Sequence, residues 1–414
     1  MKTLWLVDEH LSSKQNGVGT FVRNLLQCFE NTGHDVRLLS FDADEKEFTI
    51  VRHEGRTEYR FPVCGQNIFV NNGALSLSVL RRYVPDSAGH VFFVNHSPAD
   101  RFLAALHRLF PRSHAVFTIH DQGWTLPLLG DAALLRRVLA ARHIPAADRD
   151  TWKAVRRYCA RERRTYRLAD AVIALNGETR RIVEEAFGVP PGKIHVLPNG
   201  AAVPLPAEAD TAALRRRWGI GADECMVLFI GRTVRSKGIE ALLKAFEEVW
   251  PRCPRLRLVV AGQVFRLGEF AALTPRSVLH VSYVDLIAPE RLAELYAVAD
   301  VCVLPSYTEQ CSYTGMEMMA HGKVIIAADG HCMGDMFDES VALMARIGPG
   351  DRRDDAPFVR SLAEALERAA GLTDEARREM GRKARARYEE RYTPQRMAER
   401  YASFILQTDR LWTT

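Results

Sequence analysis

Residues 305–322 read PSYTEQCSYTGMEMMAHG. They follow the apolar run Val301–Leu304, which predicts a buried strand, and they open a segment with helical periodicity. Two carboxylates, Glu309 and Glu317, flank a patch of small and polar residues where a packed core favours neither. A buried strand followed by polar residues is typical of the edge at which open α/β sheets bind their ligands.

Short apolar runs rich in β-branched residues recur between helical patterns along the whole chain. Continuous runs of this kind predict strands covered on both faces in a parallel sheet, with helices as the crossovers. The fold class is therefore α/β. We expect strands at Leu4–Val7, Val36–Leu39, Val91–Val94, Ala115–Ile119, Ala171–Leu175, Ile194–Leu197, Met226–Ile230, Leu256–Ala261, Val278–Val281, Val301–Leu304 and Val324–Ala327.

The stretch PNGAAVPLPAEAD at 198–210 has a linker composition and divides the chain into halves of similar size. Each half carries its own series of strand and helix signals, so we expect two doubly wound Rossmann-like domains facing each other across a cleft. Residues 375–411 are strongly helical and charged. Thr393-Pro394 predicts that one helix ends there and that another begins.

The composition is that of an ordinary globular protein, with 414 residues, 47% hydrophobic and 26% charged. No apolar run approaches the roughly 18 residues of a membrane span, and the first residues meet charge at Asp8 before a secretory signal could develop, so we expect a cytoplasmic protein. The eight cysteines form no C-x-x-C pair, which favours reduced thiols over a zinc site. The net charge of +5 is modest and gives no indication of a nucleic-acid partner.

Positive charge concentrates in one predicted helix, residues 156–167. A solvated helix face is one interpretation, and a patch that contacts a polyanion or, peripherally, the inner face of an anionic membrane is the other. The arginines concerned are Arg156, Arg157, Arg161, Arg163, Arg164 and Arg167.

The first predicted strand leads to Asn16-Gly17-Val18-Gly19-Thr20, followed by an amphipathic helix over Phe21–Phe29. Glycines ahead of a helix N-terminus let backbone amides approach a phosphate closely. An ordinary glycine-rich turn is the alternative.

Two further strand ends carry side chains suited to an anionic ligand. Arg232 directly follows a predicted strand and Lys237 comes five residues later, so the pair could grip a diphosphate; the alternative is two surface cations. His120 follows Ala115–Ile119 and would form a polar wall near a reacting centre. The alternative is a loop histidine, with Asp121 capping the next segment.

The opening stretch has two interpretations. Thr314 and Glu317 have the spacing of a capping box, in which Glu317 would only bond back to the start of its helix. This leaves Glu309 unexplained. A carboxylate can accept two hydroxyl hydrogen bonds side by side, and a nucleotide sugar offers a ribose diol at one end and hexose hydroxyls at the other.

These residues resemble those of a known family. Glu309 to Glu317 matches the E-x7-E motif of retaining glycosyltransferases of family 4, which have the GT-B fold, and PSYTEQCSYTGMEMMAHGKVIIAAD resembles the segment that carries it. The resemblance covers nearly the whole chain. The other matching pieces, in order, are the early Gly loop, TIHD at 118–121, ADAVIALN at 169–176, LPNG at 197–200, FIGR at 229–232 with Lys237-Gly238, LRLVVAG at 256–262 and the long C-terminal helices.

The resemblance implies an acceptor-binding domain at 1–203, joined by the C-terminal helix 394–414, and a nucleotide-sugar-binding domain at 204–393. It also implies roles for particular residues. Arg232 and Lys237 would hold the donor diphosphate, Glu317 would bind the ribose hydroxyls, and Glu309 would bind the sugar hydroxyls. Backbone amides would contact the phosphates or the sugar around Cys311, Ser312, Tyr313 and Thr314. Gly17 and Gly19 would face the donor from the first domain, and His120 would line the reaction centre.

The sequence departs from the family at two points. Many relatives have E-G-F-G after the first glutamate, whereas Gln310-Cys311-Ser312 replaces the flexible glycines here. Asn176 stands where a serine is common. The first change alters the backbone around the sugar, so the preferred hexose cannot be inferred.

The expected reaction transfers a hexosyl group from a nucleotide diphosphate sugar to an acceptor hydroxyl, with retention of anomeric configuration. By analogy UDP is the favoured nucleotide, with GDP and ADP open, and the acceptor is a saccharide, a lipid-linked molecule or a peptide. His120, Arg232, Lys237 and Glu309 are the expected catalytic residues. No metal and no further cofactor is expected, because no D-x-D pattern stands in a promising position and two protein cations can replace a divalent ion.

Four other functions are the alternatives at this point. The chain could be a catalytically silent nucleotide-sugar-binding subunit, or another GT-B enzyme such as a sugar nucleotide epimerase. A phosphorylase would need a lysine that holds pyridoxal phosphate. A dinucleotide oxidoreductase fits worst, because Gly17-Val18-Gly19 lacks the third glycine of the fingerprint and lies too far after its strand.

Overall fold

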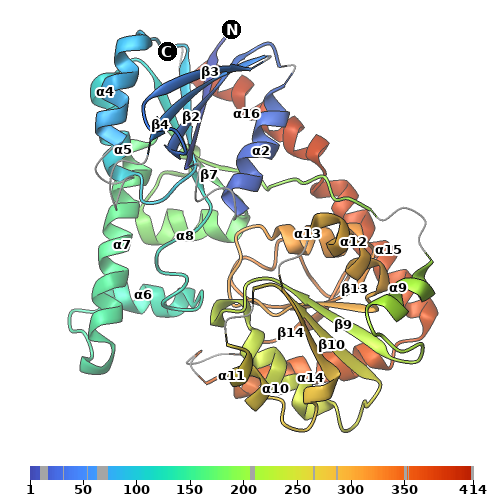
Figure 1. The fold of residues 1–414 in the computed structure, drawn as a ribbon. Coiled ribbons are helices and arrows are strands. Elements are labelled where there is room, and N and C mark those ends of the chain that lie inside the picture. Colours follow the sequence, from blue (N-terminus) through green and yellow to red (C-terminus); the bar gives the residue numbers. More distant parts are fainter. Residues whose placement is uncertain are drawn as a thin grey trace. The chain divides into compact units, whose positions relative to one another are not determined.

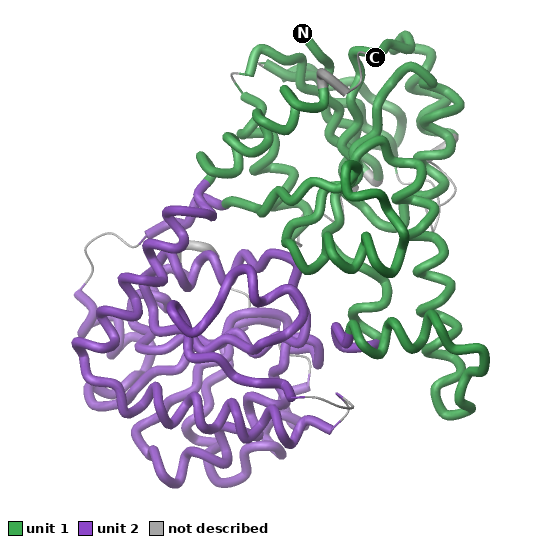
Figure 2. The backbone as a smooth tube through the Cα atoms, turned by 180° about the vertical axis from the view of Figure 1, so that it is seen from behind, with its two compact units in different colours: residues 1–127, 132–200, 394–414 green, residues 128–131, 201–393 purple. Residues whose placement is uncertain are grey.

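The computed structural model describes residues 1–9, 17–30, 32–53, 55–62, 73–205, 210–263, 266–285, 288–348, 352 and 354–411. The chain divides into two compact units (Figure 2). Unit 1 consists of residues 1–127, 132–200 and 394–414, and unit 2 consists of residues 128–131 and 201–393. Each unit is built around one sheet with helices packed against it (Figure 1).

The described sheet of unit 1 has eight strands in the order β3-β4-β2-β1-β5-β6-β7-β8. Its pairs are parallel except for β3 and β4, which form an antiparallel edge. The strands are β1 (Thr3–Glu9), β2 (Asp35–Ala43), β3 (Thr49–His53), β4 (Arg56–Pro62), β5 (His90–Val94), β6 (His114–Ile119), β7 (Ala171–Ala174) and β8 (Ile194–Val196).

The C-terminal helix of the chain packs in unit 1 against the first described helix, α2. Tyr401 anchors it, because the Tyr401 ring lies 6.0 Å from the ring of Phe29 and 6.4 Å from that of Phe93. The helices of unit 1 are α2 (Gly17–Phe29), α4 (Gly73–Tyr83), α5 (Asp100–Leu109), α6 (Ala132–Ala140), α7 (Arg149–Leu168), α8 (Gly177–Phe187) and α16 (Pro394–Leu411), with short 3-10 helices η1 (Ala146–Asp148) and η2 (Pro191–Lys193).

The described sheet of unit 2 has six strands in the order β11-β10-β9-β12-β13-β14, and all of its pairs are parallel. The strands are β9 (Cys225–Ile230), β10 (Leu256–Ala261), β11 (Val281–Val284), β12 (Val301–Leu304), β13 (Val324–Ala328) and β14 (Leu343–Ala345).

The helices of unit 2 cover both faces of this sheet (Figure 1). Alternate strand residues such as Val227 and Phe229 join a buried core with α10 and α14, because successive side chains of a strand point to opposite faces. The helices are α9 (Thr211–Arg217), α10 (Ile239–Val249), α11 (Leu267–Ala272), α12 (Pro289–Val298), α13 (Tyr313–Ala320), α14 (Ala356–Ala370) and α15 (Asp374–Arg391), with 3-10 helices η3 (Arg235–Lys237) and η4 (Val278–His280).

The α/β prediction is confirmed, and its physical basis is visible in the strands. All five residues of β5 and of β13 are buried, as continuous apolar runs require when both faces of a sheet are covered. The predicted helix break is also confirmed, since α15 ends at Arg391 and α16 begins at Pro394.

Some strand predictions were wrong. Residues 278–280 form η4, and the strand β11 begins only at Val281. The strands β3, β4 and β14 were missed. The residues of β3 are partly or fully exposed, so this edge strand has no continuous apolar run, and β14 has only three residues.

Two features expected from the composition concern membrane spans and cysteines. No described helix is long and apolar enough to cross a lipid bilayer. The seven described cysteines are free thiols, and Cys64 lies outside the described residues.

Candidate functional site

The strand order of unit 2 reverses between β9 and β12. From β9 the chain proceeds to β10 and β11 on one side, and from β12 it proceeds to β13 and β14 on the other. Open α/β sheets bind ligands outside the carboxyl ends of the strands at such a reversal. Arg232 and Lys237 follow β9, and residues 305–317 follow β12, so this edge collects the predicted donor-binding residues of unit 2.

The two loops that meet at this edge are held together backbone to backbone. The amide of Tyr307 donates a 2.9 Å hydrogen bond to the carbonyl of Ser236. Gly238 has a φ of +72°, and a Cβ at this position would lie 1.9 Å from the carbonyl oxygen of Pro305. Only glycine permits this close approach, which positions the neighbouring Lys237.

Lys237 forms an ion pair with Glu309. Lys237 Nζ lies 2.5 Å from Glu309 Oε1, and Ser306 Oγ donates a 2.8 Å hydrogen bond to the same oxygen. The side chains of the pair are 22% and 10% exposed, so both reach the surface but are largely shielded from bulk water. The structure therefore brings together one predicted diphosphate ligand and one predicted sugar ligand.

Arg232 is exposed, and its side chain makes no hydrogen bond or ion pair to any residue that the structure describes. It follows Gly231, whose φ is +152°, directly after β9. A guanidinium has five donors, and one with no acceptor among the described residues remains available to an anion in solvent.

The helix after Glu309 begins with a serine cap. Ser312 is the N-cap of α13, and its side chain accepts a 3.2 Å hydrogen bond from the amide of Gly315. The amide of Ser312 itself points at Met336 Sδ, 3.2 Å away. The capping-box interpretation of Thr314 and Glu317 is wrong, because the helix is capped two residues earlier than that spacing requires.

Glu317 accepts a hydrogen bond from another helix and not from the start of its own helix. Tyr296 Oη, on α12, donates a 2.8 Å hydrogen bond to Glu317 Oε2. Burial raises the pKa of the Glu317 carboxyl, and the hydrogen bond from Tyr296 opposes this rise. The Tyr296 ring is stacked on His321 with ring centroids 4.6 Å apart.

His120 belongs to unit 1 and lies directly after β6. Its ring packs edge-on against Phe21, with centroids 4.4 Å apart. Burial, with a smaller contribution from His96, lowers the pKa of His120 to about 3, so the imidazole is neutral at physiological pH. Its Nε2 atom is buried and has no hydrogen-bond partner among the described residues. Asp121 does not cap a helix, because α6 begins only at residue 132.

Gly17 and Gly19 also belong to unit 1, and the loop prediction for them was wrong. Both lie in the first turn of α2, which begins at Gly17 and not at Phe21. Two glycines are compatible with a helix start because the first amides have no intrahelical partner. Asn16, from the same predicted loop, lies outside the described residues.

Two family models match the chain. One, described as Glycosyltransferase Family 4, matches residues 15–203, and one described as Glycosyl transferases group 1 matches residues 224–367. The chain belongs to glycosyltransferase family 4. The resemblance inferred from the E-x7-E segment is thereby confirmed.

One relative of this family 4 glycosyltransferase is the D-inositol 3-phosphate glycosyltransferase of Rhodococcus erythropolis. It is 27% identical over 298 residues, which cover 68% of this chain and 64% of the relative. The chain spans less than two thirds of the length of this relative and of its counterparts in Nocardia farcinica and Rhodococcus jostii.

Solved structures share the fold over the whole chain. Sucrose-phosphate synthase from Thermosynechococcus elongatus has a TM-score of 0.74 at 20% identity and covers 99% of this chain and 100% of its own. Anabaena HepE, crystallised with UDP and glucose, has a TM-score of 0.68 at 17% identity and covers 98% and 99%. The chain shares its fold with these structures over nearly its whole length, and the predicted GT-B fold is confirmed.

The basic helix of this family 4 glycosyltransferase, α7, uses several of its arginines internally. Arg156 Nε donates to the carbonyl of Val138 at 2.9 Å, and Arg163 Nη2 donates to the carbonyl of Ala186 at 3.0 Å. Arg161 Nη2 lies 2.8 Å from Asp100 Oδ1. Membrane contact through residues 156–167 stays a prediction. These three arginine side chains already make hydrogen bonds or ion pairs within unit 1.

Sequence reasoning missed a carboxyl on the same helix. Glu162 is buried, and its Oε1 accepts a 2.5 Å hydrogen bond from the amide of Gly123, three residues after His120. Burial raises the pKa of Glu162 to about 8, with a further contribution from Asp121. Four residues along, Tyr166 Oη accepts a 3.3 Å hydrogen bond from Gln122 Nε2. One face of α7 thus holds the loop that follows β6.

The other residues missed are Tyr296 and His96. His96 lies just beyond β5, with Nε2 3.4 Å from Asp8 Oδ1, so inspection of the residues after the predicted strand Val91–Val94 could have found it. Tyr296 lies inside a helix, and its partner Glu317 is 21 residues away. No local sequence signal points to it.

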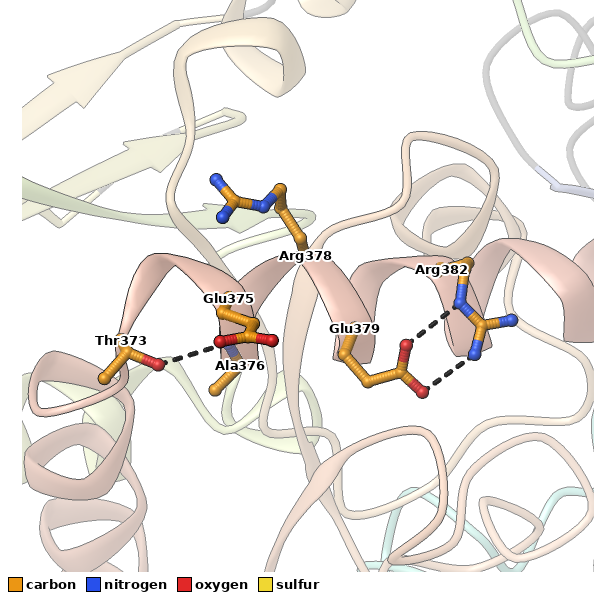
Figure 3. A pocket seen from close by; sticks show the side chains of 6 residues that line it. All are labelled: Thr373, Glu375, Ala376, Arg378, Glu379 and Arg382. Carbon is orange, nitrogen blue, oxygen red and sulfur yellow. Dashed lines mark hydrogen bonds and ion pairs between the residues drawn. The ribbon is translucent and has the colours of Figure 1, made fainter.

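A surface hollow of about 570 Å³ lies elsewhere in unit 2, along the start of α15 (Figure 3). Thr373 caps that helix by accepting a hydrogen bond from the amide of Ala376 at 3.2 Å. Glu379 and Arg382, which face each other in Figure 3, form an ion pair at 2.8 Å. None of the predicted site residues lines this hollow.

Proposed function

We propose that this family 4 glycosyltransferase transfers a hexosyl group from a nucleotide diphosphate sugar to an acceptor hydroxyl, with retention of anomeric configuration. Unit 2 binds the donor and unit 1 binds the acceptor. The observation that supports this most directly is the set of Arg232, Lys237, Glu309 and Glu317 at the strand-order reversal of unit 2.

Arg232 and Lys237 hold the donor diphosphate in this proposal. The exposed guanidinium of Arg232, which has no partner among the described residues, supports its role as a fork for phosphate oxygens. Backbone amides at the start of α13, around Cys311, Ser312, Tyr313 and Thr314, add partial positive charge. These groups stabilise the negative charge that gathers on the leaving diphosphate in the transition state.

Glu309 and Glu317 recognise hydroxyl groups. Glu309 has an oxygen, Oε2, without a hydrogen bond to the described residues, and it accepts from the hexose. Glu317 accepts from the ribose of the nucleotide. The crystal structure of HepE with UDP and glucose supports UDP as the nucleotide, because that protein shares this fold.

The chemical step is a displacement on one face of the sugar. The bond from the anomeric carbon to the diphosphate breaks, the bond to the acceptor oxygen forms on the same face, and a donor phosphate oxygen takes the acceptor proton. No protein nucleophile is involved. His120 lines the reaction centre as a neutral hydrogen-bonding group, consistent with its pKa of about 3, and Gly17 and Gly19 face the donor from α2. The reaction requires no metal, because two protein cations neutralise the diphosphate.

A panel of nucleotide sugars tests the proposal. UDP-, GDP- and ADP-hexoses are screened for an increase in melting temperature, since a ligand that binds only the folded state stabilises it in proportion to occupancy. The best donor is then incubated with acceptors in EDTA, and the anomeric configuration of the product is read by NMR. Stabilisation without turnover or donor hydrolysis would favour a silent binding subunit. An inverted product, or activity abolished by EDTA, would overturn the corresponding part of the proposal.

A further inference from the structure

Tyr296 connects α12 to the carboxylate of Glu317. Its side chain is 1% exposed, and its hydroxyl donates a 2.8 Å hydrogen bond to Glu317 Oε2. Both residues belong to unit 2, on helices that precede and follow β12. A hydroxyl that donates to a carboxylate oxygen makes a stronger bond than one between neutral groups, so it orients the carboxylate.

The Tyr296 ring is itself held in place. The His321 ring, at the end of α13, lies 4.6 Å from it with an interplanar angle of 15°. Burial, together with Lys323 and Arg385, lowers the pKa of His321 to about 4, so the stacked ring is neutral at physiological pH. Stacking and burial therefore restrict the rotamer of Tyr296, and the position of its hydroxyl is set before any ligand binds.

The hydrogen bond from Tyr296 distinguishes the two carboxylate oxygens of Glu317. Oε2 is occupied by Tyr296, whereas Oε1 has no hydrogen-bond partner among the described residues. Oε1 is not one of the fully buried polar atoms that lack a partner, so it keeps a spare acceptor position for a ligand. Arg232 and Lys237, the proposed diphosphate ligands, follow β9, the strand that pairs with β12.

We infer that Tyr296 is a positioning residue that fixes the Glu317 carboxylate so that Oε1 accepts hydrogen bonds from the ribose hydroxyls of the donor. Tyr296 thereby makes the site selective for ribonucleotides over deoxyribonucleotides. The inference rests on the proposed function, because it assumes that a nucleoside diphosphate binds at this edge of unit 2.

The test compares ribose variants of one ligand. The nucleoside diphosphate that binds the full chain best among UDP, GDP and ADP is titrated by calorimetry alongside its 2′,3′-dideoxy form. We expect the wild type to bind the ribose form about 10-fold more tightly, as expected for hydrogen bonds to a charged acceptor. In Tyr296→Phe, the ratio of the two affinities should fall to about 1, because the carboxylate is no longer oriented.

A matched control separates orientation from general damage. Tyr283 is a tyrosine of the same unit whose hydroxyl is buried and has no hydrogen-bond partner among the described residues. Tyr283→Phe should keep the wild-type ratio. The ratio refers to the folded fraction only, so partial unfolding of Tyr296→Phe does not change it. His321→Ala, which keeps the tyrosine hydroxyl but removes the stack, should give an intermediate ratio.

The outcomes distinguish the inference from the proposed function. If the wild type binds none of the three diphosphates, or binds the ribose and dideoxy forms equally, the proposed donor site itself fails. If the wild type is selective and Tyr296→Phe is equally selective, the donor site stands and the role assigned to Tyr296 is wrong.

Discussion

Lys237 and Glu309 form an ion pair across the two loops that follow β9 and β12, with Lys237 Nζ 2.5 Å from Glu309 Oε1. Ser306 Oγ adds a 2.8 Å hydrogen bond to the same oxygen. The lysine is therefore oriented by a carboxylate. A donor bound at this edge would contact Lys237 through its phosphates and Glu309 through its sugar. This one pair of residues would therefore bind both parts of the ligand.

Loss of the lysine charge should depress turnover far more than it changes stability. We expect Lys237→Ala to lower kcat about 10²- to 10³-fold, because a group that stabilises transition-state charge is removed. The measurement is steady-state kinetics with the donor identified by the panel. Lys244→Ala is the matched control, since Lys244 is also ion-paired, to Asp355 at 2.7 Å, but lies on α10. Near-normal turnover in Lys237→Ala would contradict its proposed role.

The ion pair should make the two residues energetically coupled. We expect the losses of kcat/KM in Lys237→Ala and Glu309→Ala to be non-additive in the double variant, with a coupling of about 0.5–3 kcal/mol. The physical reason is that either single change already removes the orientation of the partner. The four proteins of the double-mutant cycle give the coupling directly. Additive losses would mean that the two side chains act independently on phosphate and sugar.

The close approach at Gly238 should make alanine costly there. Gly238 has a φ of +72°, and an added Cβ would lie 1.9 Å from the Pro305 carbonyl oxygen. We expect Gly238→Ala to lower the free energy of unfolding by about 2 kcal/mol or more. Urea unfolding measures this. In Gly268→Ala the new Cβ meets nothing within 4 Å, and the φ is not in the left-handed region, so this control should be neutral or slightly stabilising. Equal effects at both positions would be inconsistent with the geometry.

The buried carboxyl of Glu162 should make stability depend on pH. Burial raises its pKa to about 8 from the ordinary value of 4.5, so the folded state binds more protons than the unfolded state between these pH values. Relative to Glu162→Gln, the contribution of Glu162 to the free energy of unfolding is fully present below about pH 4.5. This contribution is lost as the pH rises towards 8, by at most about 1.4 kcal/mol per pH unit. Urea unfolding of both proteins at pH 5, 6, 7 and 8 measures the difference. A difference independent of pH would show that Glu162 is ionised in the folded protein.

The fold could be predicted where strands are covered on both faces. Continuous apolar runs such as Val324–Ala327 correspond to β13, in which all residues are buried. Apolar runs did not predict the edge strand Thr49–His53, whose side chains are partly or fully exposed, and they wrongly predicted a strand at Val278–Val281, most of which forms a 3-10 helix. Apolar content signals burial, and it signals a strand only when the burial is two-sided.

The candidate site could be located in part. Residues that directly follow predicted strands, such as Arg232 and His120, were found because the carboxyl ends of parallel strands share one edge of a sheet. The glycine loop at Gly17 was misjudged, since a helix can begin within it. Tyr296 was missed because it lies within a helix and its hydrogen-bond partner, Glu317, is 21 positions away.

By itself, the sequence determined the α/β class, the positions of most strands and the membership of glycosyltransferase family 4, because these depend on local apolar patterns and on short motifs in order. Only the tertiary structure decided which side chains pair: Lys237 with Glu309, 72 residues apart, and Tyr296 with Glu317. The physical reason is that such pairs are created by strand order and by backbone contacts such as that of Gly238 with Pro305. Neither of these is encoded in the spacing of the residues along the chain.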